Sequence, residues 1–153
     1  MAMLRLLFLL LLPAAAGIAA NPGGSAECIG ATMPAIQAGA KGRILTTSSE
    51  AFVFVSSSGQ VSIPYDRINL LEYGQEVGRR VVMAVVVSPM FLLLKHRAHF
   101  LTVGFRDAED KQQALVLRLD KGIVRSTLAI LEGRSGRSVT YQDKDARQSR
   151  KGG

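Results

Sequence analysis

The feature that most constrains the fold of this chain is an apolar run from Val81 to Leu94. Twelve of its fourteen residues are apolar, and only Ser88 and Pro89 interrupt them. The run is shorter than the ~20 apolar residues that a membrane-spanning helix needs. A segment of this kind is therefore either a buried element of the core or an element that docks on a membrane surface.

The residues around the Ser-Pro turn decide between these two interpretations. Residues 81–87 are rich in β-branched side chains, which favours a strand buried on both faces. If the residues after Pro89 protrude instead, they need a lipid or a protein partner. Cations bracket the run and would lie at headgroup level in the membrane interpretation. The candidate membrane or partner contacts are Arg79, Arg80, Met90, Phe91, Leu92, Lys95 and Arg97.

The first twenty residues predict a secretory signal peptide. Arg5 supplies a positive n-region, residues 6–12 form an apolar h-region, and small residues near Ala19 offer a cleavage site. We therefore expect an exported protein, periplasmic in a bacterium or extracellular, whose mature chain begins near Ala20 or Asn21.

Residues 21–41 are rich in glycine, proline and alanine and show no sustained period, so we expect a flexible linker there. The only cysteine, Cys28, lies within this stretch. One cysteine cannot form an internal disulfide, so the fold must be held by its core.

Short segments with β-rich or alternating composition follow. We expect strands at residues 44–47, 51–55, 60–65, 66–73, 81–87, 98–105 and 113–119, with a hairpin turn at 107–111. Residues 139–141 add either a short strand or an extended tail. Within residues 66–73 the alternation places Ile68 and Leu70 on one face, joined by Tyr73 only if the register slips. Within residues 113–119, leucines alternate with Ala114, Val116 and Arg118.

A helix follows the strands. Asp120 is a suitable N-cap, the apolar residues from Ile123 to Leu131 form one stripe, and Gly133 suits the left-handed position after the helix. Residues 142–153 are polar and charged, and we expect disorder there. The predicted core is Phe54, Ile63, Ile68, Leu70, Val85, Leu101, Val103, Leu115, Leu117, Val124, Leu128 and Leu131.

The order of these elements predicts an α+β, mostly β fold: a curved antiparallel barrel of about seven strands with a C-terminal amphipathic helix. This order over residues 42–141 resembles the pleckstrin-homology-like (PH/GRAM-like) superfold. The stretches IPYDRINLLEYGQ, KHRAHFLTVGF and IVRSTLAILEGRSG are similar to small exported bacterial proteins of unknown function. The resemblance implies binding of lipids, peptides or proteins. After the predicted signal peptide only Lys41 and Arg43 precede the loop at residues 47–50, and no further base comes before Arg67, so we do not expect inositol-phosphate recognition.

The sequence predicts neither an enzyme nor a cofactor or metal site. His96 and His99 point to opposite faces of a strand, and no nucleophile elbow or phosphate loop is present. The formal charge of +7 favours anionic partners, but aromatic residues make up only 6% of the chain and no RNA-binding motif occurs, so we do not expect nucleic acid. We expect a non-catalytic exported binding module that contacts a protein partner or a second copy. The alternative is a peripheral module that docks on an anionic membrane through residues 81–94.

Overall fold

A computed structural model describes residues 24–75 and 98–142 of the chain. The predicted signal peptide, the apolar run at 81–94 with Val85, and the polar tail after residue 142 lie outside these ranges. The described elements are β1 (Ser25–Ala31), β2 (Lys41–Leu45), β3 (Ala51–Ser56), β4 (Gly59–Pro64), η1 (Tyr65–Arg67), β5 (Ile68–Gly74), β6 (His99–Arg106), β7 (Gln112–Leu119), η2 (Lys121–Ile123), α3 (Val124–Ser135) and β8 (Thr140–Tyr141).

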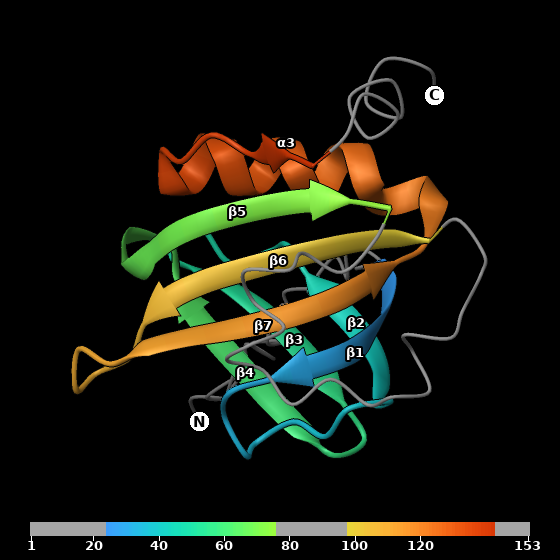
Figure 1. The fold of residues 1–153 in the computed structure, drawn as a ribbon, viewed down its shortest axis with the longest axis horizontal. Helices are drawn as coiled ribbons and strands as arrows, with labels where there is room; N and C mark the ends of the chain where they lie inside the picture. The colour runs from blue at the N-terminus through green and yellow to red at the C-terminus, as the bar shows by residue number, and fades with distance from the viewer. Residues whose placement is uncertain (1–23, 76–97, 143–153) are drawn as a thin grey trace, which may run out of the picture.

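The eight strands form one open, curved sheet in the order β4-β3-β2-β1-β7-β6-β5-β8. All neighbours are antiparallel except β5 and β8, which are parallel. In Figure 1, β2, β3 and β4 pass behind β6 and β7, and α3 lies along the β5 side of the sheet. A mostly β fold with one C-terminal helix is therefore confirmed.

The expected flexible linker at residues 21–41 is wrong for its central part. Ser25–Ala31 is strand β1, which lies in the middle of the sheet between β2 and β7. Its residues Ala26 and Cys28 are buried in the core. The pattern was hidden because a bulge between Cys28 and Gly30 breaks the alternation, and because small residues dominate the strand.

The inner core lies between the concave side of the sheet and α3. One cluster of buried residues joins the two halves of the sheet to Val124, Leu128 and Leu131 of the helix. All described members of the predicted core except Leu70 are buried. These buried residues are Phe54, Ile63, Ile68, Leu101, Val103, Leu115, Leu117, Val124, Leu128 and Leu131. The helix thus closes the sheet as its apolar stripe predicts.

The exception is Leu70, which was expected in the core and is only half-buried. The register of β5 against β6 shifts between Ile68 and Leu70. This bulge turns Leu70 to the outer face and places Leu71 and Tyr73 in the core instead. The register slip that would bring Tyr73 to the inner face therefore occurs earlier in the strand, between Ile68 and Leu70.

The helix ends also differ from the prediction. Asp120 precedes the short turn η2 and not α3 itself, and its side chain makes no capping hydrogen bond. Gly133 lies inside the helix, and Gly136, with φ of 67°, occupies the left-handed position after it. The amide of Gly136 donates to the carbonyl of Glu132, which satisfies one of the last helical acceptors.

A second group of apolar side chains lies on the outer, convex face of the sheet. This outer cluster consists of Ile29, Phe100, Ala114 and Val116, with half-buried Leu70 and Ala98 packed against it. It follows from the alternation of β6 and β7, in which Leu101, Leu115 and Leu117 point inward. Both faces of the central strands are therefore apolar at this point.

Candidate functional site

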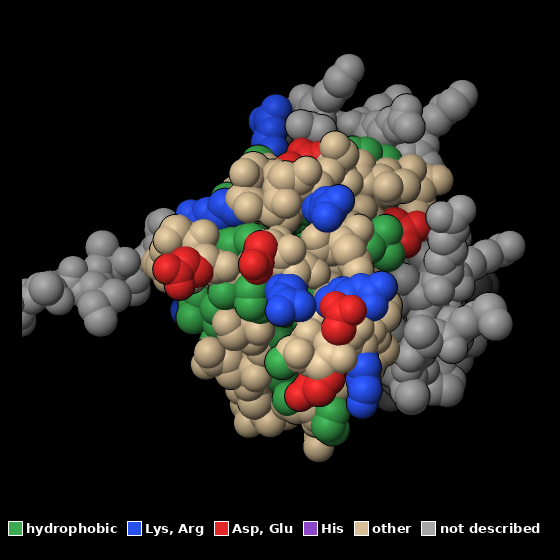
Figure 2. Space-filling view, turned by 90° about the vertical axis from the view of Figure 1, so that its left-hand side faces the viewer, with side chains coloured by type: hydrophobic (Ala, Val, Ile, Leu, Met, Phe, Trp, Pro, Cys, Tyr) green, Lys and Arg blue, Asp and Glu red, His purple; other side chains and the backbone are tan. Residues whose placement is uncertain are grey.

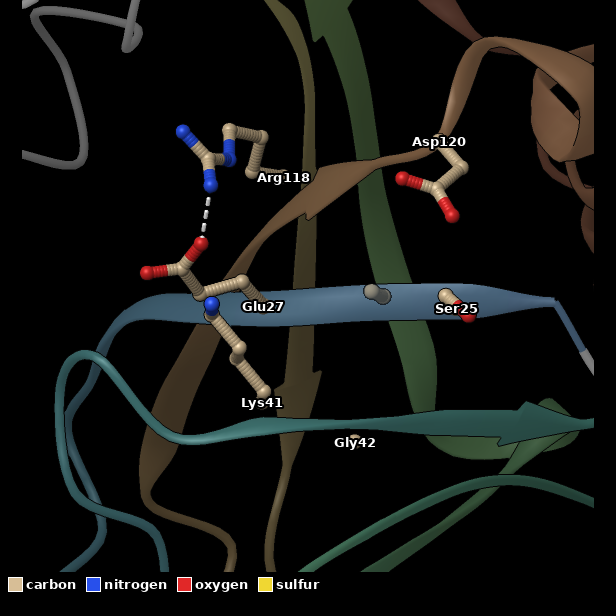
Figure 3. Close-up of a pocket in the computed structure, with 7 residues that line it drawn as sticks. Ser25, Glu27, Lys41, Gly42, Arg118 and Asp120 are labelled. Carbon is tan, nitrogen blue, oxygen red and sulfur yellow. Dashed lines mark hydrogen bonds and ion pairs between the residues drawn. The ribbon is translucent and has the colours of Figure 1, made fainter.

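A hollow of about 310 Å³ opens on the outer face where β1, β2 and β7 lie side by side. We call it the charged hollow. Figure 3 shows the residues that line it: Ser25, Ala26, Glu27, Lys41, Gly42, Arg118 and Asp120. Four of the seven carry a formal charge, two of each sign.

Three of these charges form a row across the sheet. Glu27 lies directly opposite Arg118 on β7 and opposite Lys41 on β2. Directly opposed residues point to the same face of a sheet, so the three side chains are neighbours. Phe100 of the outer cluster is in turn opposite Arg118. The charged hollow therefore continues the outer cluster along the same face.

Glu27 and Arg118 form an ion pair at the centre of the row, drawn as a dashed line in Figure 3. The Glu27 side chain is 11% exposed, whereas that of Arg118 is 37% exposed. The carboxylate is thus mostly withdrawn from water, and Arg118 neutralises it. The guanidinium keeps several N–H donors that can reach a bound molecule.

Lys41 and Asp120 stand at the margin of the hollow. Both are exposed, and neither forms an ion pair with another described residue. The backbone fixes Asp120, because its amide donates to the carbonyl of Ser25 and its carbonyl accepts from the amide of Ile123. The hollow therefore offers one cation and one anion to a ligand, on either side of a neutral pair.

Cys28 lies next to Glu27 but on the inner side of β1, fully buried. Burial raises the pKa of the thiol to about 11. A hydrogen bond with the Gly30 backbone opposes this rise, and the negative charge of Glu27 adds a smaller upward contribution to the pKa. A thiol with this pKa stays protonated near neutral pH, so Cys28 acts as a small core residue.

A second polar contact joins Tyr73 and His99, the first residue of β6. The Tyr73 hydroxyl and His99 Nδ1 are 2.6 Å apart, and the two rings stack with centroids 6.1 Å apart. Burial, and next the charge of Lys121, lower the pKa of His99. His99 is half-buried, while His96 lies outside the described residues.

The contacts predicted from sequence are not placed by the structure. Arg79, Arg80, Met90, Phe91, Leu92, Lys95 and Arg97 all lie outside the described ranges. Within those ranges, no group of three or more His, Cys, Asp or Glu side chains is arranged to hold a metal ion. No helix of residues 24–75 and 98–142 has the length and apolar character to cross a membrane.

The residues of the charged hollow were missed because four of the seven, Ser25, Ala26, Glu27 and Lys41, lie in the supposed linker. One signal was present: Ser25 and Glu27 alternate with Ala26 and Cys28, as in a strand with one polar face. Neither a comparison with protein-family models nor one with curated proteins finds a match to this chain. The fold and the hollow define the class of the protein: a mostly β domain with a closing helix and a charged recess on its outer face.

Proposed function

We propose that the chain is an exported, non-catalytic binding module with the PH-like architecture. It works as an interaction domain or subunit in the cell envelope or in a secreted assembly. The pattern of residues 1–20 supports export, and the order of strands followed by one helix supports the architecture. The observation that carries a binding role is the charged hollow with Lys41 and Asp120 at its margin.

The balance of charge in the hollow favours a protein partner over a phosphate group. Arg118 is already neutralised by Glu27, and Asp120 opposes Lys41, so the recess has no surplus positive charge. Figure 2 shows the same character on a neighbouring face, where basic and acidic side chains are interspersed. Mixed charges of this kind suit the complementary mixed surface of another protein, where they provide specificity.

A specific observation also favours the membrane alternative. Residues 24–75 and 98–142 contain ten Lys and Arg against nine Asp and Glu, so six of the seven surplus positive charges lie outside them, three of these in residues 76–97. Four cations bracket the apolar run. At ~1 kcal/mol each on an anionic surface they give only millimolar affinity. Insertion of Phe91 and Leu92, at roughly 1.5–3 kcal/mol apiece, would be needed to reach micromolar affinity.

Charge reversal at the hollow tests the protein-partner proposal. The mature protein is recovered from the envelope or medium of its native host after mild cross-linking, and its complexes are measured by native mass. Lys41→Glu with Asp120→Lys should lower the cross-linked fraction about tenfold, equivalent to ~1.4 kcal/mol. Lys111→Glu with Glu109→Lys, at the exposed hairpin tip, is the matched control and should leave it unchanged. Equal complexes in both double variants would contradict the proposal.

Vesicle co-sedimentation distinguishes the membrane alternative from the protein-partner proposal. If the membrane alternative holds, the mature protein binds anionic vesicles and loses this binding in the double variant Phe91→Asp with Leu92→Asp. Binding that survives the double substitution, or that is absent from the unaltered protein, would contradict docking through this segment.

A further inference from the structure

The outer cluster poses a packing problem that the described elements leave open. Ile29 and Val116 are 0% exposed, although they lie on the face turned away from α3. Among residues 24–75 and 98–142, the more extensive contacts between elements join sheet neighbours or involve α3, which belongs to the inner core. A contiguous group of apolar side chains on one face of a sheet needs a cover.

The path of the chain brings a suitable cover to this face. Strands β5 and β6 are antiparallel neighbours with Gly74 opposite Phe100, a geometry that a loop of two to five residues can join. The connection between β5 and β6 instead contains residues 76–97. It leaves after Gln75 and returns at Ala98, which itself packs against the outer cluster. Both ends of the segment therefore start beside Phe100.

A carboxylate with one buried oxygen on the same face supports the same conclusion. Glu72 lies two residues after Leu70 on the outer side of β5, opposite buried Thr102. Its Oε2 atom is buried and has no hydrogen-bond partner among the described residues. A buried acceptor of this kind calls for a donor, and a charged one for a cation. The segment carries four such donors: Arg79, Arg80, Lys95 and Arg97.

We propose that the outer face of β1, β5, β6 and β7 is an intramolecular docking surface, and that its occupant is the apolar run Val81–Leu94 of the same chain. One of the cations that bracket the run pairs with the Glu72 carboxylate. The run then completes a second apolar layer, and its side chains are withdrawn from both lipid and partner proteins. With the outer cluster covered in this way, the charged hollow beside it remains the surface for the partner binding proposed above.

Disulfide trapping in the full mature chain tests this proposal. Leu70→Cys, at the half-buried margin of the cluster, is combined in turn with Val82→Cys, Val86→Cys or Phe91→Cys, and Cys28 is kept because it is buried. Mild oxidation should give a disulfide within one chain for at least one pair, identified from peptide masses. The matched control places the first cysteine at Ser62, which is exposed on β4, and should react at least tenfold less.

A second measurement keeps the test independent of the paired variants. Leu70→Cys alone should react at least tenfold more slowly with a maleimide than the same variant carrying Val82→Asp and Val86→Asp, with unchanged far-ultraviolet circular dichroism. Disulfide-linked dimers that grow with concentration would overturn the proposal in favour of a second copy. Equal maleimide rates, together with binding of the mature protein to anionic vesicles, would overturn it in favour of a lipid surface.

Discussion

The ion pair between Glu27 and Arg118 should respond unequally to loss of its two partners. Replacing Arg118 by Gln leaves a carboxylate that is only 11% exposed without its cation. An unsatisfied buried charged group costs about 1–3 kcal/mol or more. Replacing Glu27 by Gln leaves a guanidinium that is 37% exposed and still hydrated, and the amide oxygen of Gln still accepts from it. We expect that change to cost about 1 kcal/mol or less.

Thermal and urea unfolding of the two single variants and of the double variant measure this asymmetry. For a domain of this size, 1 kcal/mol corresponds to roughly 4–8 °C in Tm. Arg118→Gln should therefore melt at least several degrees below Glu27→Gln. The double variant should recover part of the loss, because no buried charge remains. A larger cost for Glu27→Gln, or additive losses in the double variant, would refute the reasoning.

The remaining predictions concern the core, the histidine, the cysteine and export. Leu128→Ala should lower the free energy of unfolding by roughly 2–5 kcal/mol, because Leu128 is 1% exposed between helix and sheet. Ile130→Ala, at a half-buried position of the same helix, is the control. A Tm of Leu128→Ala shifted by less than a degree or two would contradict docking of the helix. The lowered pKa of His99 favours its neutral form in the folded state. Its contribution to folding stability is therefore full above a pH of about 6.5 and is lost as the pH falls below that value. The Tm of the wild type should fall more between about pH 7.5 and 5.5 than that of His99→Gln, and equal losses in the two proteins would contradict this prediction. Cys28, with its pKa raised to about 11, should resist iodoacetamide at about pH 8 until the chain is unfolded, so rapid labelling of the native protein would be the contrary result. Protein recovered from its native host should have a mature N-terminus near Ala20 or Asn21, and retention of Met1 to Ala19 would contradict export.

Regular alternation made much of the sheet predictable. Residues 51–55, 60–65, 98–105 and 113–119 each overlap an observed strand, because each is rich in β-branched or aromatic residues or alternates along the chain. The helix was predictable because its apolar stripe matches the period of an α-helix. These signals are local, so they need no knowledge of the partner strand.

The errors fall where a bulge or small side chains weaken that local signal. In β5 the extra residue before Leu70 exchanges the faces of everything after it, and no property of Leu70 or Leu71 distinguishes the two registers. In β1 the side chains are small, and glycine and proline on either side favour a linker. The strand forms because β2 and β7 pair with both of its edges, which is information from distant parts of the chain.

The same error in β1 concealed the charged hollow, because its row of charges exists only when three strands are in register. Lys41 and Arg118 are 77 residues apart in sequence and are brought together through Glu27 alone. The net charge pointed elsewhere, since the described part of the chain is almost neutral and the surplus lies in residues 1–23, 76–97 and 143–153. A binding surface built from balanced charges leaves no trace in the net charge. It follows that added salt should lower the affinity for a protein partner at the hollow only modestly. Binding of the bracketing cations to anionic lipid should instead weaken steeply as the salt concentration rises.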